Sequence, residues 1–212
     1  LGTAYRGLLN WTSSGQYAAE VKAAEARIGP VLAAFQAQPV EKVAADPSAR
    51  QMGERIFLVN CAQCHGSDAR GTPGFPNLAD GVWDWGRTPE AIVQSIAAGR
   101  VAVMPPLAAA VGTAEDVTDL AHYVLSLSTS AHDTVRAARG KDKFAACAAC
   151  HGAEGKGNPA LGARDLTQKD GWRHGRTVAG VTEVIVKGRT GVMPAQKGIL
   201  SDAQIHLVAA YV

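Results

Sequence analysis

Two copies of the pattern Cys-x-x-Cys-His contain all four cysteines of this 212-residue chain. This spacing is the attachment signature of c-type haem: the two thiols form thioethers with the porphyrin vinyl groups, and the adjacent histidine ligates the iron. The chain is therefore expected to wrap two covalently bound haem groups. The residues predicted to hold them are Cys61, Cys64 and His65 in the first motif, and Cys147, Cys150 and His151 in the second.

Other roles for these cysteines explain less of the pattern. A disulfide framework is typical of small secreted chains with poor cores, and this chain is long enough for two cores. A zinc site needs four ligands around one ion, whereas each cysteine pair here is followed by its own histidine. A thioredoxin-like redox pair requires no such histidine and is not expected twice. The haem interpretation is thus favoured.

The chain also repeats itself around the two motifs. Trp83-x-x-Gly86-Arg87-Thr88 matches Trp172-x-x-Gly175-Arg176-Thr177, and Gly99-Arg100-x-x-Val103-Met104-Pro105 matches Gly188-Arg189-x-x-Val192-Met193-Pro194. The matched residues are 89 positions apart. A period of this length indicates a duplicated domain rather than a solenoid repeat. Each copy matches a single-haem cytochrome domain.

The repeat points to methionine as the sixth iron ligand. Met104 and Met193 share the context Val-Met-Pro, and each is the only methionine that follows the motif of its own copy. We predict that His65 pairs with Met104 and His151 with Met193. Filled axial positions leave no catalytic site, and thioether ligation raises the reduction potential, so both haems would carry electrons. A bis-histidine haem using His122 or His206 is the alternative.

Two further pairs of repeated residues are candidate haem contacts. Arg100 and Arg189 precede the methionines by four residues and could each bind a haem propionate, because arginine suits carboxylates. The competing interpretation is a solvated arginine after a helix-ending glycine. Trp83 and Trp172 are expected to pack against haem and to use their indole N–H groups in hydrogen bonds.

Helix signals predict an all-α fold of two tandem class I cytochrome c domains. Residues 48–130 form the first expected domain and 131–212 the second, with a truncated C-terminal helix. Residues 1–47 are expected to be a helical segment and linker, with a helix from Tyr17 that ends at Gly29-Pro30. The family resemblance given below implies that this segment is juxtamembrane.

The distribution of charge suggests different neighbours for the two copies. Lys and Arg minus Asp and Glu give −3 for residues 48–130 and +5 for 131–212. Opposite potentials raise encounter rates, so the acidic copy, with Glu115, Asp116 and Asp119, is the expected docking face for a basic donor cytochrome. Both imbalances acting only as solubilising charge is the alternative.

The chain contains no run of the ~20 apolar residues that would cross a bilayer, and no signal peptide is visible. Because residue 1 is leucine, we expect a longer natural chain. Haem attachment at this motif takes place outside the cytoplasm, which predicts an extracytoplasmic location.

The segments Trp11-Thr12-Ser13-Ser14-Gly15-Gln16-Tyr17, Asn60-Cys61-Ala62-Gln63-Cys64-His65-Gly66 and Phe75-Pro76-Asn77-Leu78 resemble the dihaem subunit of cbb3-type cytochrome c oxidase. The resemblance implies a proton-translocating terminal oxidase complex in the bacterial inner membrane, with the haem domains on the periplasmic side. It implies an upstream membrane helix, a catalytic haem- and copper-containing subunit, a monohaem subunit and a donor cytochrome c, with no nucleic acid among the partners.

Two other functions remain open at this point. One is a free periplasmic dihaem electron carrier, or the haem subunit of a dehydrogenase. The other is a dihaem peroxidase, which needs an exchangeable or histidine-filled distal position; Met193 argues against it.

Overall fold

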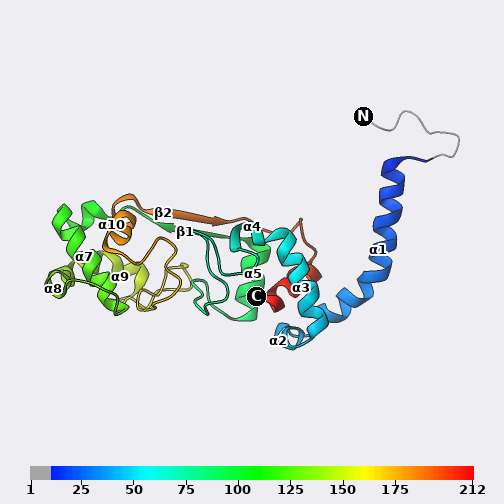
Figure 1. Cartoon of the computed structure of the whole chain (residues 1–212), viewed down its shortest axis with the longest axis horizontal. Coiled ribbons are helices and arrows are strands. Elements are labelled where there is room, and N and C mark those ends of the chain that lie inside the picture. The colour runs from blue at the N-terminus through cyan, green and yellow to red at the C-terminus, as the bar shows by residue number, and fades with distance from the viewer. Residues whose placement is uncertain (1–10) are drawn as a thin grey trace.

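The computed structural model describes residues 11–212, which are mostly helical with a single two-stranded ribbon (Figure 1). The elements are α1 (Ser13–Gln36), α2 (Val40–Ala44), α3 (Pro47–Asn60), α4 (Ala62–His65), α5 (Pro89–Ala98), β1 (Arg100–Met104), α6 (Ala108–Val111), α7 (Ala114–Leu127), α8 (Thr134–Gly140), the 3₁₀ helix η1 (Asp142–Phe144), α9 (Ala145–His151), α10 (Val178–Lys187), β2 (Arg189–Met193) and α11 (Asp202–Tyr211).

Local capping explains why most helices begin where they do. The Asp46 carboxylate accepts hydrogen bonds from the backbone N–H groups of Ser48 and Ala49 at the start of α3. Thr113 and Ser201 begin α7 and α11 with complete capping boxes, in which the third helical residue bonds back to the cap. Such caps satisfy backbone donors that lack a partner inside the helix. The helices expected after Thr88, Thr113, Thr177 and Ser201 are all present.

The ribbon departs from the all-α expectation. β1 and β2 are antiparallel, with Arg100 opposite Met193, Ala102 opposite Gly191 and Met104 opposite Arg189. The two strands are the same segment of the two repeats, so they pair about an approximate twofold axis. Figure 1 shows the ribbon running from the group of helices around α10 to the group around α4 and α5. Each strand therefore leads its methionine away from the helix that precedes it.

The strands exchange the last part of each repeat. After β1 the chain continues into α7, which packs against α8 and α10 of the second repeat. After β2 it continues into α11, which packs against α3 and α5 of the first repeat. We define the first unit as residues 47–99 with 194–212, and the second unit as residues 105–188. The sequence repeats 48–130 and 131–212 are thus not the compact bodies of the structure.

Each unit has its own hydrophobic core made from both repeats. In the first unit, Phe57 of α3 lies with Ile205 and Val208 of α11, and its ring centroid is 5.4 Å from that of Tyr211. In the second unit, Leu120 and Leu125 of α7 join Phe144 and Ile185, and the rings of Tyr123 and Phe144 are 5.3 Å apart. The exchanged helices bury their apolar faces in these cores, which is the main stabilising contribution to the arrangement.

Glycines permit close approach of the exchanged helices. A Cβ on Gly53 of α3 would lie 2.5 Å from the carbonyl oxygen of Leu207 in α11. The matching Gly140 of α8 lies equally tightly against the Asp119 carbonyl of α7. At each of these two equivalent glycines, the backbone of a helix from the other repeat thus packs directly against the glycine.

The N-terminal segment differs from its prediction. Helix α1 begins after the cap Thr12 and continues through Gly29-Pro30 to Gln36, so the expected end at Gly29 is wrong. A proline inside a helix removes one backbone hydrogen bond but does not have to stop the helix. None of its residues is buried, although Leu32 and Phe35 pack against Val43 and Leu207. Residues 1–10 of the expected 1–47 segment lie outside the described part. Across residues 11–212, none of the helices has the length and apolarity that a bilayer crossing needs.

The exchange predicts a specific effect of Gly53→Ala. The added methyl group would push α11 away from α3 and lower the free energy of unfolding by about 1–3 kcal/mol, as overpacking does. Amide hydrogen exchange should accelerate in α3 and α11 and stay unchanged in α7. Gly29→Ala is the matched control, because no atom outside its own helix lies within 4 Å of the added Cβ. Faster exchange in α7 with α11 protected would contradict the exchanged arrangement.

Candidate functional site

Both motif histidines are buried and held in the same way. His65 ends α4 and is 8 % exposed, and His151 ends α9 and is 9 % exposed. The Nδ1 atom of His65 lies 3.1 Å from the carbonyl oxygen of Pro76, and that of His151 lies 2.8 Å from the carbonyl oxygen of Arg164. When Nδ1–H donates to such a carbonyl, the lone pair is on Nε2, the nitrogen that then faces a metal. Each ring is oriented as an iron ligand requires.

The four motif cysteines are free thiols in the structure. Cys61 is half-buried and Cys147 is buried, whereas Cys64 and Cys150 are exposed. Burial raises the pKa of the Cys61 and Cys147 thiols, and the neighbouring cysteine of each motif adds to this effect. Each pair lies on one short helical turn beside its histidine, so both thiols and the imidazole reach the same side of the turn.

The methionines do not lie with the histidines of their own repeats. Met193, at the end of β2, packs against the first-unit cluster that contains Phe57, Ile96 and Cys61. The loop after it is fixed there by hydrogen bonds from the Gln196 and Lys197 N–H groups to the last carbonyls of α5. The packing thus disagrees with the expected pairing of His151 with Met193.

The other methionine follows the symmetrical path. The Met104 carbonyl lies against Gly188, at the end of α10 in the second unit, and the Leu107 N–H donates to the Ile185 carbonyl over 2.9 Å. Gly188 has a φ of +67°, and a Cβ there would lie 2.6 Å from the Met104 oxygen. Gly99 is in the equivalent situation against Met193, with a φ of +71°. Glycine at both helix ends therefore lets the incoming methionine loop cross.

The two predicted propionate-binding arginines have protein partners. The Arg100 Nε donates to Ser95 Oγ over 2.9 Å, and its guanidinium lies 4.8 Å from the centre of the Trp85 ring. Arg189 forms an ion pair of 3.0 Å with Glu183. The solvated-arginine interpretation therefore does not describe either side chain. A propionate role for Arg100 and Arg189 stays a prediction.

The repeated tryptophans lie in the loops before α5 and α10. Trp83 is half-buried, and Trp172 packs against the core of the second unit. The indole N–H of Trp172 donates to the Gln168 carbonyl over 2.8 Å, as expected for a partly buried indole. Contact of either ring with haem stays a prediction.

A charged cluster between the units was missed at the sequence level. Asp84 of the first unit forms ion pairs with Arg164 and Arg173 of the second. Its side chain is only 5 % exposed. Burial lowers the pKa of Arg164, and the Asp84 carboxylate opposes that shift. Asp84 and Arg173 follow the matched tryptophans Trp83 and Trp172, so opposite charges at equivalent repeat positions were the signal available.

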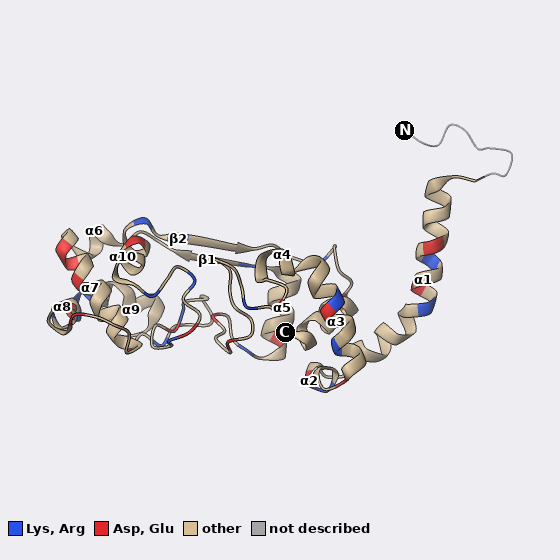
Figure 2. Ribbon diagram, in the orientation of Figure 1, with Lys and Arg blue, Asp and Glu red and all other residues tan. Residues whose placement is uncertain are grey.

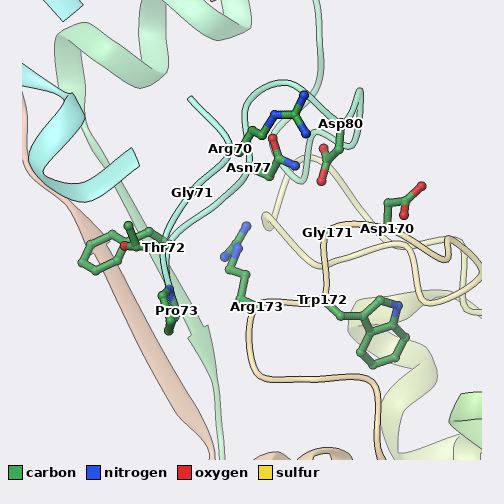
Figure 3. A pocket seen from close by; sticks show the side chains of 11 residues that line it. Arg70, Gly71, Thr72, Pro73, Asn77, Asp80, Asp170, Gly171, Trp172 and Arg173 are labelled. Atoms are coloured by element: carbon green, nitrogen blue, oxygen red, sulfur yellow. The ribbon is translucent and has the colours of Figure 1, made fainter. Parts of the chain in front are cut away.

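A polar groove of about 380 Å³ lies beside this cluster, between the loop at residues 70–80 of the first unit and the loop at residues 170–173 of the second. Figure 3 shows Arg173 between the two loops, with Arg70, Asn77 and Asp80 on one side and Trp172 on the other. The Gly74 N–H also donates to the Arg173 carbonyl. The two loops are thus joined by backbone as well as by charge.

The donor set fits c-type haem at both motifs. Each motif offers two free thiols and an imidazole whose Nδ1 is bonded to a carbonyl, and the strands of the ribbon end with one methionine at each unit. Among residues 11–212, no three His, Cys, Asp or Glu side chains gather as a metal-binding cluster. His122, a candidate for the bis-histidine alternative, uses Nδ1 to accept the Asp133 N–H over 2.9 Å at the α7–α8 contact.

The acidic docking face expected on the first repeat is not a free surface. Asp119 pairs with Arg136 and Arg139, at 2.9 and 2.6 Å, and Asp116 pairs with Lys143 at 2.9 Å. These partners, and the 3.4 Å contact of Glu115 with Arg139, belong to the second repeat. Figure 2 shows the acidic residues of α7 at the end of the molecule that also holds α8.

Exchange of the helices also removes the charge asymmetry. The first unit holds five basic and six acidic residues, and the second holds ten basic and nine acidic residues. The charge difference that suggested a donor-docking face at Glu115, Asp116 and Asp119 is therefore absent between the units. The docking role of these residues stays a prediction.

Comparison with known proteins gives one family. The family profile described as cytochrome c oxidase, cbb3-type, subunit III matches residues 48–124 and again 135–212. The chain is 53 % identical over 207 residues to the cbb3-type cytochrome c oxidase subunit CcoP of Rubrivivax gelatinosus, covering 98 % of this chain and 68 % of the relative. It is 37 % identical over 226 residues to the subunit FixP of Rhizobium meliloti (strain 1021), covering 100 % and 78 %. The 38 % identity to FixP of Bradyrhizobium diazoefficiens spans 97 % and 76 %.

The ion pairs of Asp119 predict how stability depends on pH. Hydrogen bonding and charge from Arg139 hold the pKa of Asp119 below its ordinary value of 3.8. A lowered native pKa gives stabilisation that is fully present above pH 3.8 and is lost as the pH falls through the native value. Asp119→Asn should lower the urea midpoint at neutral pH and flatten its decline between about pH 5 and about pH 2. Asp142→Asn, which removes an exposed carboxylate on η1, is the control. In this variant the urea midpoint should fall with pH as steeply as in the wild type. An unchanged slope for Asp119→Asn would contradict the prediction.

Proposed function

As the chain belongs to the family of cbb3-type cytochrome c oxidase subunit III, we propose that it is the electron-transfer subunit of such an oxidase. It carries two covalent c-type haems and passes electrons from a donor cytochrome toward the subunit that reduces oxygen. It has no catalytic site of its own.

One observation supports this proposal: each unit contains a motif with two thiols and an imidazole, and one strand of the ribbon ends there with its methionine. Pro76 and Arg164 fix the two imidazoles, and the ribbon delivers one methionine to each unit. Haem bound in such a site supplies a one-electron carrier of raised potential. With one histidine and one methionine as its protein ligands, such a haem would offer no free position for oxygen or a peroxide.

We infer that the residues holding each haem come from both repeats. His65 and Met193 would hold the haem attached to Cys61 and Cys64, and His151 and Met104 would hold the second. The supporting contacts are those of Met193 with the core around Phe57 and of the Met104 loop with the end of α10. The ribbon then ties the two irons together, because each strand ends in a ligand.

The relatives are named as subunits of cbb3-type oxidases, and this supports the proposed surroundings. The partners are the catalytic haem- and copper-containing subunit, a monohaem subunit and a donor cytochrome c. The units lie on the periplasmic side of the bacterial inner membrane, and an anchor upstream of α1 holds them there. The whole complex is a proton-translocating terminal oxidase.

Covalent attachment is the first property to test. Denatured protein made in a host that matures c-type cytochromes should carry two haems per chain by mass spectrometry and by the pyridine haemochrome assay. Cys61→Ser with Cys64→Ser should remove one haem and keep the other, and Cys147→Ser with Cys150→Ser should do the same for the second. Porphyrin that acid–acetone extracts from the wild type would contradict thioether attachment.

Crossed ligation can be separated from ligation within a repeat by using single-haem proteins. In the Cys147→Ser, Cys150→Ser background only the first haem remains. Met193→His should then lower its reduction potential and remove the ferric sulfur-to-iron charge-transfer absorption, because a nitrogen ligand favours ferric iron. Met104→His is the matched control and should leave both properties unchanged. The reverse result would restore the pairing of His65 with Met104.

A further inference from the structure

The acceptor of the second proximal histidine differs from that of the first. The carbonyls of Pro76 and Arg164 occupy equivalent places, each accepting the Nδ1–H of its motif histidine. The proline ring fixes φ of Pro76 near −65°, which removes one of the two backbone rotations that place its carbonyl. Arg164 has no such restraint on φ. Its neighbour Ala163 is paired with Asn158 by two backbone hydrogen bonds, and the Arg164 side chain adds further contacts.

The side chain of Arg164 supplies an anchor. Its Nη2 donates to the Asp170 carbonyl, its guanidinium lies 5.6 Å from the centre of the Trp172 ring, and its Nη1 lies 3.6 Å from Asp84 Oδ1. The side chain is 16 % exposed. Two of these contacts come from the same unit, whereas Asp84 comes from the first unit. The only carboxylate that ion-pairs with Arg164 in the described part of the chain is thus on the other side of the interface.

Charge balance makes Asp84 essential to this anchor. Arg173 lies beside the same carboxylate, so one buried anion holds two guanidinium groups. Asp84 Oδ1 and Arg164 Nε have no hydrogen-bond partner in the described structure, so charge attraction holds this pair. Without the carboxylate, the two guanidinium groups would lie together in a desolvated contact with no anion between them. Their repulsion would then drive them apart.

We propose that Asp84 is a positioning residue for the second haem: through the side chain of Arg164 it holds the carbonyl that orients the His151 ring. This inference rests on the proposed function, in which His151 is the proximal ligand. The first haem needs no such device, because Pro76 orients His65 within its own unit. The proximal geometry of one haem therefore depends on a residue of the unit that binds the other.

The experiment uses the full dihaem chain in its ferrous, diamagnetic form. Solvent exchange of the two histidine Nδ1 protons is followed by NMR, after the haemochrome assay has established two covalent haems. Asp84→Asn should accelerate exchange at His151 by about tenfold or more, the size expected when a buried partner is lost. Exchange at His65 should stay at the wild-type rate. Asp142→Asn, which removes an exposed carboxylate of η1 that takes no part in this anchor, is the charge-matched control and should change neither proton.

A second variant tests the route through Arg164. Arg164→Pro gives the second loop the residue of the first, and the Arg164 N–H donates no backbone hydrogen bond among the described residues. The double variant Asp84→Asn, Arg164→Pro should return exchange at His151 to near the wild-type rate. If Asp84→Asn does not fold, Arg164→Gln breaks the same link while the ion pair of Asp84 with Arg173 is retained. This variant should accelerate solvent exchange of the Nδ1 proton at His151 alone.

Three results would overturn the proposal. These are unchanged exchange at His151 in folded Asp84→Asn, equal acceleration at both histidines, and failure of Arg164→Pro to restore the slow rate. Failure of the proposed function is distinguishable, because it would appear as a missing second haem or as a proximal ligand other than His151 in the wild type.

Discussion

The antiparallel pairing of β1 with β2 is the interaction on which the rest of the structure depends. Each strand starts at the helix-ending glycine of one unit and finishes with a methionine in the other. Because the strands run in opposite directions, α7 and α11 are delivered to opposite ends of the molecule. The two cores, the two methionine positions and the placement of the charged α7 all follow from this one crossing.

The fold could be predicted from the sequence as far as local signals extend. Capping residues and glycines located α5, α7, α10 and α11, because their effects act within one helical turn. The ribbon and the exchange could not be predicted in this way. Arg100–Met104 and Arg189–Met193 carry no strong strand pattern, and a repeat is compatible both with two closed copies and with two copies that share their ends. Packing in three dimensions decides between them.

For the candidate site too, local features could be predicted from the sequence and long-range contacts could not. His65 and His151 were identified from the motifs, and the structure places each against a backbone carbonyl. Which unit each methionine packs in is a long-range property. Met193 packs against the core of the first unit, which disagrees with the natural expectation of pairing within a repeat. The ion pairs of Asp116 and Asp119 could not be predicted for the same reason, because these residues meet their basic partners only after the exchange. Asp84 was overlooked since its partners are 80 or more positions away.

The position of α11 has a consequence for how the molecule is made. Synthesis runs from the N-terminus, so the segments that close the first unit emerge after every element of the second. Under the proposed function, haem would be attached at the first Cys-x-x-Cys-His motif while its unit still lacks α11, whereas α7 is synthesised before the second motif. Contacts of such long sequence separation form slowly. The chain topology would thus determine the order in which the two motifs are enclosed, and the motif that is synthesised first would be enclosed last.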